Sequence, residues 1–260
     1  ENVGTFVPAN DIDNEDLDAV WLGGRLRGEK TFENSGLSFL DYRLDIIGLI
    51  GEEDVLQTGV AAGAFRPVTQ SRSRDVMAYA IDAGVNARFG GERSPLFTIN
   101  YAFGSGDENP NDDRDEGFKQ SGLHGNSSRL GLSSTGVRNY GEVLRPELSN
   151  LHILSAGLGM PVWDASDVSL FYHYYRLDED VTDLRVDGLS TPLNGQDKFV
   201  GQGADLVLNT ELLEALAINS SVIDDARLRF NLGAFKAGDA FGAGEDEYSF
   251  RTFSELMLRF

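Results

Sequence analysis

Long stretches of this chain alternate apolar and ionised residues at every second position, and this rhythm limits the fold more than any other feature. Between residues 37 and 50, the even positions carry apolar side chains such as Ile46. The odd positions there include Asp41, Arg43 and Asp45. A helix would mix the two sets on one face, because its side chains repeat every 3.6 residues. The pattern therefore predicts a β-strand with one apolar and one ionised face.

The same alternation recurs along the chain, and clusters of Gly, Asp, Asn and Pro divide it into about ten strands. The strands are expected at residues 17–28, 37–50, 54–65, 76–89, 95–104, 146–160, 167–178, 198–209, 225–235 and 248–260. Many of them exceed the roughly 5 to 6 residues of an ordinary globular strand. They match the roughly 9 to 11 residues that cross a bilayer at a tilt.

The expected connections between these strands alternate in length. Tight turns are expected at residues 51–53, 90–94 and 161–166, and longer polar loops at 66–75, 105–145, 179–197 and 236–247. Outer-membrane barrels have short turns on one side and long loops on the other. We therefore expect residues 105–145 to form a long extracellular loop, with the acidic run at 107–116 as a solvated part of it.

Composition excludes several classes of protein. The net charge of −20 opposes binding to nucleic acid, whose phosphates require a basic surface. The absence of cysteine excludes a disulfide scaffold and Cys-ligated metal sites. The sequence contains no run of about 18 apolar residues, so it predicts no helical membrane span. The usual motifs of metalloproteases, serine hydrolases and P-loop proteins are missing, so we predict no enzyme, no cofactor and no metal.

The polar face of the strands distinguishes a barrel from a soluble β-sandwich. A sandwich usually presents Lys, Thr, Ser and Glu to water, whereas here the polar positions are Asp, Arg, Asn and Glu. Lipid outside and an ionised aqueous lumen inside explain both faces, and closure pairs every strand edge. We predict an all-β fold, an antiparallel transmembrane β-barrel of the bacterial outer membrane, with residues 1–260 in a single domain. A soluble sandwich that binds acidic polysaccharide is the alternative.

Aromatic residues near the expected strand ends suit the girdles that flank a membrane-spanning band. They are Trp21, Tyr101, Phe103, Trp163, Tyr174, Tyr248 and Phe260. At the C-terminus, Leu256, Leu258 and Phe260 are apolar at alternate positions of the last strand. This ending resembles the signal by which the barrel assembly machinery recognises bacterial outer-membrane barrels.

Four segments of the chain resemble the alginate export family. They are FKQSGLHGNSSR at 118–129, YGEVLRPELSN at 140–150, GQGADLV at 201–207 and FKAGDAFG at 235–242. The resemblance spans about residues 65–260. It implies an outer-membrane barrel of roughly eighteen strands with an arginine-rich lumen, through which a secreted uronate polysaccharide leaves the cell.

About ten strands are too few for the barrel of that family, so the chain resembles its C-terminal half. A small closed barrel of ten strands is the alternative. The resemblance implies that the last strand ends in the periplasm, and an even number of strands would then also begin there. It further implies contact with outer-membrane lipid, an alginate-like polymer as cargo and delivery of that polymer by a periplasmic export scaffold. It also implies that the periplasmic turn at 210–225 plugs the pore. The alternative is that residues 210–225 form an ordinary long turn.

A polyuronate carries one carboxylate per sugar. Its passage therefore requires cations that replace the water lost by these carboxylates but bind them only weakly. A pair of unit charges at about 4 Å interacts by roughly 4 kcal/mol at an effective dielectric constant near 20. The candidate arginines of the lumen are Arg25, Arg27, Arg43, Arg88, Arg129, Arg138, Arg145, Arg227, Arg229, Arg251 and Arg259.

Acidic residues among these arginines are expected to orient them and to weaken their grip on the polymer. The candidates are Asp41, Asp45, Asp82, Asp205 and Glu255. His173 shares the strand parity of Ser169 and Tyr175, which leaves two interpretations, a contact with sugar or an ordinary hydrogen-bonded histidine. Structural ion pairing alone is the alternative for the whole set, and a general small-solute porin is the alternative function.

Overall fold

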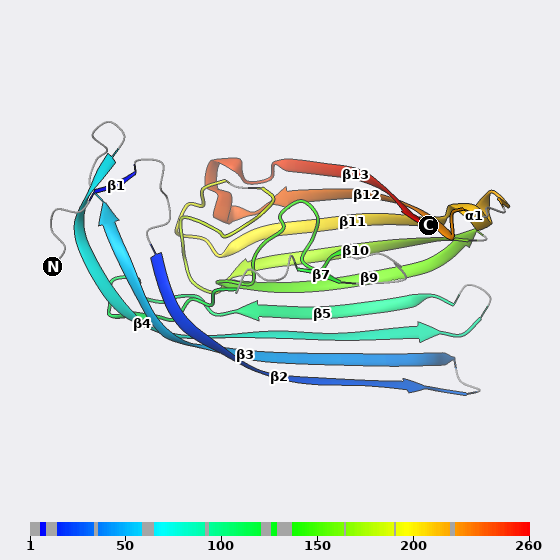
Figure 1. Cartoon of the computed structure of the whole chain (residues 1–260), viewed down its shortest axis with the longest axis horizontal. Helices are drawn as coiled ribbons and strands as arrows, with labels where there is room; N and C mark the ends of the chain where they lie inside the picture. Colours follow the sequence, from blue (N-terminus) through cyan, green and yellow to red (C-terminus); the bar gives the residue numbers. More distant parts are fainter. Residues whose placement is uncertain are drawn as a thin grey trace.

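One large, strongly curved β-sheet dominates the computed structural model of the chain (Figure 1). The structure describes residues 6–8, 15–33, 36–58, 65–91, 94–120, 126–128, 137–163, 165–189, 191–218 and 222–260. Its long strands run side by side, with the loops at one end and the tight turns and the C-terminus at the other. We call these two ends the loop end and the turn end.

The long strands of the sheet are antiparallel to their neighbours and follow one another in sequence order. They are β2 (Glu15–Thr31), β3 (Leu37–Thr58), β4 (Phe65–Phe89), β5 (Leu96–Gly104), β9 (Leu151–Trp163), β10 (Ser166–Leu177), β11 (Phe199–Glu211), β12 (Asp225–Ala237) and β13 (Tyr248–Arg259). The prediction of an all-β chain of about ten antiparallel strands is confirmed.

The remaining described elements are short. On β4, β1 (Phe6–Pro8) pairs antiparallel and β6 (Arg114–Asp115) pairs parallel. A separate ribbon joins β7 (Ser127–Ser128) to β8 (Val137–Arg138). The α-helix α1 (Leu212–Ala215) follows β11, and the 3₁₀ helix η1 (Asp239–Gly244) follows β12. None of the helices in the described ranges has the length and apolar character that a membrane crossing requires.

The expected turn at residues 51–53 is wrong, because β3 runs through it without interruption. Gly51 pairs with Ala19 on β2, and a Cβ atom at Gly51 would clash with the carbonyl oxygen of Asp18. The glycine therefore permits a close approach of two strands where β2 to β4 bend sharply (Figure 1), rather than a chain reversal. The expected polar loop at 66–75 likewise lies within β4.

This correction changes the direction of the first strand. The expected strand 54–65 has no place of its own: its first residues extend β3, and 59–64 lie outside the described residues. As a consequence, β2 begins at the loop end, whereas β13 finishes at the turn end (Figure 1). The expectation that both lie on the same side is wrong.

The sheet does not close on itself in this chain. Its hydrogen-bonded order begins at β13 and finishes at β2, and no described pairing joins these two strands. The alternative of a small closed barrel is therefore wrong for this chain. The sandwich alternative is not found either, since the long strands form one curved sheet and not two stacked ones.

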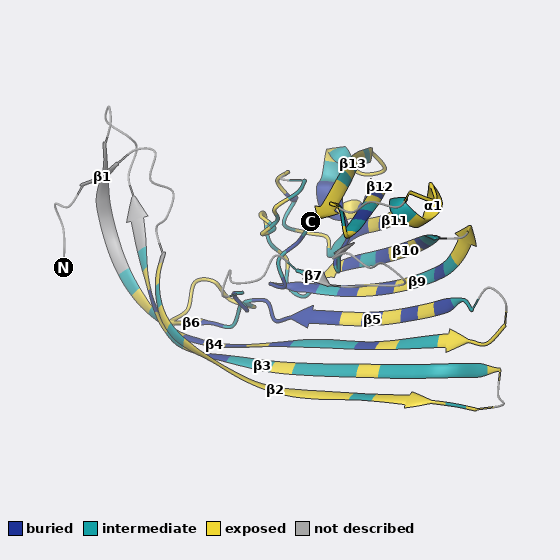
Figure 2. Cartoon of the chain, turned by 45° about the vertical axis from the view of Figure 1, so that its right-hand side comes forward, coloured by how far each residue is buried: buried dark blue, intermediate teal, exposed yellow. Residues whose placement is uncertain are grey.

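Along each strand, side chains alternate between an outer face and a concave face, and Figure 2 shows the corresponding stripes of burial on β5 and β9. Between the strand ends, the described outward positions of β5 and β9 to β13 carry no charged residue, and the same holds for β3 up to Ile50 and for β4 from Met77 onward. Glu52, Asp54 and Asp75 lie outward only where β3 and β4 bend. Large apolar side chains are exposed there, including Ile46, Met77, Ile99 and Leu170. The outer face is thus a continuous apolar band.

The loops between β5 and β9 and between β10 and β11 fold onto the concave face at the loop end. There, Leu49, Val76 and Ile153 of the sheet form a common buried cluster with Leu144 and Leu148 of the first loop. The larger hydrophobic core of the described residues therefore lies inside the curve of the sheet under these loops, and a small second cluster joins Phe171 of β10 to Val207 of β11.

Candidate functional site

Ionised side chains line the concave face of β2, β3 and β4 toward the turn end. Cross-strand partners share a face, and the register pairs Arg25 with Asp45. Nε of Arg25 lies 2.5 Å from Oδ1 of Asp45. Arg43 points an Nη atom at Asp82 on β4, at 3.3 Å. Asp41 accepts a hydrogen bond of 2.9 Å from the side-chain amide of Asn86. Each of the three predicted acids on these strands therefore faces a donor on the same surface.

A second set of ion pairs lies at the turn end of β12 and β13. Arg229 is buried, and its guanidinium lies 2.9 Å from Glu255 and above the ring of Phe253 at 5.0 Å. Arg227 lies 3.0 Å from both Glu211 and Asp225. These contacts fix both arginines in place while the carboxylates offset much of their charge.

The other predicted arginines differ in position. Arg27, Arg88, Arg251 and Arg259 occupy concave-face positions of strands and are exposed. Arg138 and Arg145 belong to the loop before β9 and not to the main sheet. Arg129 lies outside the described residues.

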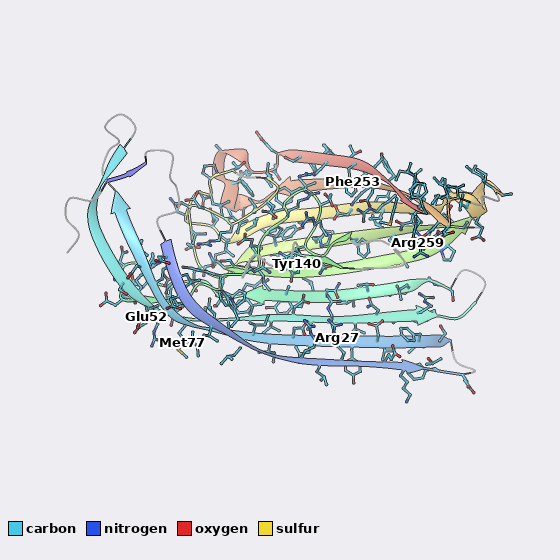
Figure 3. All side chains as sticks on the ribbon, in the orientation of Figure 1. Arg27, Glu52, Met77, Tyr140, Phe253 and Arg259 are labelled. Atoms are coloured by element: carbon cyan, nitrogen blue, oxygen red, sulfur yellow. The ribbon has the colours of Figure 1, made fainter. Side chains whose placement is uncertain are left out.

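Residues 140–145, which we call the crossing segment, span the concave face from β4 to β13. At one end, the Tyr140 hydroxyl donates a hydrogen bond of 3.0 Å to Asp82 on β4. The Tyr140 carbonyl accepts one of 2.9 Å from the hydroxyl of Tyr175 on β10. Figure 3 shows Tyr140 over the middle of the sheet. The segment therefore lies across the trough between the core and the ionised surface.

The other end of the crossing segment is held by Glu142, which is 1% exposed. The Glu142 N–H donates to Asp205 on β11 at 2.9 Å. Its carboxylate forms an ion pair with Arg145, lies 3.7 Å from Arg251 and accepts a hydrogen bond of 3.3 Å from Asn231. A single buried carboxylate thus joins three elements of the concave face.

The surroundings of Arg145 are rich in positive charge. Burial, together with the nearby charges of Arg251 and Arg138, lowers the pKa of Arg145 to about 10. A guanidinium whose charged form is disfavoured in this way attracts anions, because an added negative charge relieves the repulsion. In the structure, the anion in this position is the Glu142 carboxylate, which pairs with Arg145 and approaches Arg251.

His173 lies on the concave face, but it is only 1% exposed. Its Nδ1 is 2.7 Å from the Ser155 hydroxyl, and its Nε2 is 3.3 Å from Asp205. These contacts make it a buried hydrogen-bonded histidine beside the carboxylate that anchors the crossing segment. A direct contact of His173 with sugar is not compatible with this burial.

One cluster was missed from the sequence. At the loop end, the buried carboxylate of Glu53 forms ion pairs with Arg74 at 2.6 Å and with Lys119. Asp115 joins it, 3.2 Å from Arg74 and 2.8 Å from Lys119. Asp115 belongs to the acidic run that we expected to be solvated, and it is 4% exposed, so that expectation is wrong for this residue.

Trp21 was also misplaced by the sequence. It pairs with Leu49, which faces the concave side, and its indole N–H donates a hydrogen bond of 2.9 Å to the carbonyl of Lys119. It is therefore an anchor for the first loop and not part of an outer girdle. Tyr101 and Tyr248, in contrast, are exposed on the outer face.

The turn between β11 and β12 contains one turn of helix, α1. No residue of α1 is buried, and the helix lies at the turn end of the sheet (Figure 1). Across the described residues, no group of three His, Asp or Glu side chains is arranged to hold a metal ion. The arrangement on the concave face is suited to transient binding of anions.

Comparison with known proteins shows the family of the chain. A family model described as alginate export matches residues 11–255. The alginate production protein AlgE of Pseudomonas aeruginosa is 32% identical over 262 residues, which cover 97% of this chain and 52% of that protein. AlgE of Pseudomonas syringae pv. tomato is 25% identical, with 93% and 50% covered, and AlgE of Azotobacter vinelandii is 28% identical, with 72% and 40% covered. The chain spans about half the length of these curated relatives, and it belongs to the alginate export family.

Proposed function

We propose that this chain forms one wall of an outer-membrane pore that exports an anionic uronate polysaccharide similar to alginate. The observation that carries the proposal is the division of one sheet into two faces. Apolar side chains cover the outer face, whereas paired arginines and carboxylates line the uncovered part of the concave face. Lipid outside and water inside account for both.

The outer face supports a position in the bilayer. At about 3.3 Å per residue, the 12 to 13 residues of β9 to β13 extend about 40 Å. At the tilt of roughly 40° that is usual in barrels, they cross a hydrocarbon core about 30 Å thick. The uncharged band of these strands fits that requirement.

The concave face supports passage of a polyanion. Arg25, Arg43 and Arg229 each have a carboxylate partner within 3.3 Å. A uronate must compete with that partner, so each site attracts the polymer without retaining it, and the polymer can move from one site to the next. The net charge of −20 does not oppose this path, because exposed charges more than about 8 Å away are largely screened at physiological salt.

The crossing segment is the constriction of the proposed path. It lies across the concave face, and its carboxylate Glu142 occupies Arg145 and approaches Arg251. An entering uronate would replace Glu142 on these arginines. The turn at 210–225 is a second obstruction in the proposal, at the periplasmic mouth, and the loop at 105–145 faces the cell exterior.

The pore requires strands beyond this sheet. In hydrocarbon, the free edges of β2 and β13 must be paired, because no water is present to satisfy their backbone groups. We infer that further strands complete the wall, that the barrel assembly machinery inserts it through the ending Leu256, Leu258 and Phe260, and that a periplasmic scaffold delivers the polymer.

Conductance of the complete barrel in planar bilayers tests the proposal. We expect polyuronate added on the turn-end side to block the current, and Arg227→Ala and Arg229→Ala to reduce both the block and the preference for anions. Arg72→Ala is the matched control, because Arg72 pairs at the loop end with the exposed Asp113. If Arg227→Ala and Arg229→Ala leave anion preference unchanged, the arginine path is wrong at those positions.

The general porin is the second candidate, since an ionised wall also suits small anions. It predicts anion-selective current that polyuronate does not block. Block by polyuronate, with weaker block by a neutral polysaccharide of equal length, would exclude it.

A further inference from the structure

A pocket of about 600 Å³ lies on the outer face of the sheet, at the loop end of β5, β9 and β10. We call it the rim pocket. Tyr101, Leu154 and Tyr174 line it, and each alternates along its strand with a residue buried on the concave side. The rim pocket is therefore separated from the proposed polymer path by the thickness of the sheet.

The polar end of the rim pocket contains Arg176 and Lys198. Arg176 is exposed, and none of the described residues forms a hydrogen bond or ion pair with its side chain. Lys198 donates to Glu179 at 3.1 Å and to the carbonyl of Asp178. The Arg176 guanidinium thus has no carboxylate partner among the described residues. The outer-face positions near it are apolar or aromatic.

The two acids of the rim pocket are already engaged. Asp178 accepts a hydrogen bond of 2.9 Å from the backbone N–H of Gly106 and lies 3.3 Å from Nε2 of His152. His152 in turn contacts the Tyr101 hydroxyl through Nδ1 at 2.8 Å. Glu179 holds Lys198. These hydrogen bonds leave the charge of Asp178 in place, so the four ionised side chains of the rim pocket sum to zero, and Arg176 is the cation among them that forms no ion pair with a described residue.

The apolar end of the rim pocket continues into the outer band of the sheet. Leu154 is 49% exposed, and Ile99 and Leu170 are exposed on the neighbouring strands. The Tyr174 ring stacks on Phe199 at 5.3 Å, which gives the pocket an aromatic wall. A ligand that fits has hydrocarbon at one end and an anionic group at the other.

The exposed arginine indicates at which level of the membrane the rim pocket lies. An outward-facing arginine is far more costly at the centre of a bilayer than near its surface. Arg176 is the second-last residue of β10, directly before the loop that begins at Asp178. The proposed membrane placement puts it at the level of lipid head groups, where basic side chains bind phosphate.

We propose that the rim pocket binds a membrane lipid through a phosphate on its head group. Arg176 and Lys198 contact the phosphate, and the acyl chains lie along Leu154 and Ile99. A guanidinium is well suited to this contact, because its planar fork matches two phosphate oxygens. The inference rests on the proposed function only for the placement of the outer face in lipid.

Native mass spectrometry of the complete barrel in maltoside micelles tests the inference. The protein is titrated with lipid A and, separately, with lipid A from which both phosphates have been removed. We expect the phosphorylated form to bind at least about tenfold more tightly, and Arg176→Gln to weaken it about tenfold. Arg176→Gln combined with Lys198→Gln should remove the difference between the two lipids.

Lys236→Gln is the matched control. Lys236 also lies on the outer face at the loop end, but on β12, and it is paired with Asp246 at 2.5 Å. It should leave lipid binding unchanged. Equal binding of the two lipids, or an Arg176→Gln variant that binds like wild type, overturns the proposal.

Two further arms exclude other ligands. Displacement of lipid A by millimolar inorganic phosphate would show a free-anion site, and displacement by soluble polyuronate would show a polymer site, and either result overturns the proposal. If polyuronate does not block the current through the wild-type barrel in bilayers but lipid A binds, only the proposed function is contradicted. If polyuronate blocks the current but lipid A does not bind, only the lipid site is contradicted.

Discussion

The two ends of the concave face differ, although the same strands build both. On β12, Phe235 at the loop end is buried in the core, whereas Arg227 and Arg229 at the turn end form ion pairs. On β3, Leu49 and Arg43 show the same contrast. The strand periodicity is unchanged between the ends, so the difference lies in the residue types and in the loop that covers only one of the two ends.

This difference teaches that the face of a strand does not by itself decide the chemistry of its side chains. Where the loops fold inward, the concave face is a dry core that stabilises the molecule. Where no loop lies on it, the same face keeps ionised pairs that suit an aqueous path. The crossing segment, held by Tyr140 and Glu142, lies at the boundary.

Phe235→Ala is expected to have the largest effect on stability. Phe235 is 1% exposed and contacts the rings of Tyr175 and Phe241. Its removal should lower the free energy of unfolding by about 4 kcal/mol, because a cavity remains in the core. Phe250→Ala on the outer face is the matched control and should cost clearly less, since detergent fills the space. Urea titrations in micelles measure both, and equal losses would mean that the loop end has no dry core.

Glu53→Gln is expected to be next in size. The Glu53 carboxylate faces both Arg74 and Lys119 in a buried cluster, so its loss leaves two buried cations to share the remaining carboxylate of the cluster. Asp115 still pairs with both cations after the substitution, so we expect a loss of about 2 kcal/mol, below that of a fully broken buried pair. Asp113→Asn is the control, because Asp113 is 94% exposed and its pair with Arg72 should contribute less than about 1 kcal/mol. A similar small effect of both substitutions would show that the cluster is solvated.

Tyr175→Phe tests how the crossing segment is held. The substitution removes the hydroxyl that donates to the Tyr140 carbonyl and leaves the buried ring in place. We expect a loss of about 1 kcal/mol and a higher conductance, because the segment is released from β10. Tyr174→Phe, on the outer face of the same strand, should change neither. Unchanged conductance in Tyr175→Phe would separate the crossing segment from the constriction.

The pH dependence of stability should show the smallest effect, through Asp115. Burial raises its pKa, but the hydrogen bond and charge of Lys119, the N–H of Gly117 and the charge of Arg74 outweigh this and hold the pKa below the ordinary value of 3.8. The folded state therefore favours the ionised form, so this stability is present above pH 3.8 and is lost as the pH falls through the folded pKa.

Asp115→Asn should remove that part of the acid-induced loss, as measured by urea titrations between about pH 5 and pH 2. Asp107 in the same loop is the opposite case, because burial raises its pKa. The stability that its protonated form gives is lost as the pH rises above 3.8, so Asp107→Asn should stabilise the protein at pH 7. An identical acid limb in Asp115→Asn and wild type would contradict this assignment.

The strands from β5 onward could be predicted from the sequence to within about three residues, except that β9 begins at Leu151 and not at residue 146. Their outer faces are apolar without interruption, which makes the alternation clear. The prediction failed at residues 51–75, where Gly51 and the acids beside it imitate a turn. Their polarity has another cause, since Glu53 is neutralised by Lys119, 66 positions along the chain. Pairing over such a distance leaves no local pattern.

The candidate site was predictable to a similar degree. The arginines of the strands lie on the face that alternation assigned to them, but alternation could not show that the loop around Glu142 lies across that face. Trp21 was misplaced for the same reason, because its partner is the backbone of a distant loop. The alternation of apolar and polar residues predicts which face of a strand a residue occupies, but it does not predict which loop covers that face.

The central claim is that the outer face of the sheet meets lipid and the turn end of the concave face meets water. The chain contains no cysteine, so single cysteines on β3 can report this directly. In outer-membrane vesicles made permeable at both sides, Arg43→Cys and Asp45→Cys should react with a charged, membrane-impermeant maleimide. Leu44→Cys and Ile46→Cys should react only after the lipid is dissolved. Reaction at Leu44→Cys and Ile46→Cys with protection at the other two positions, or equal reaction at all four, would contradict the account.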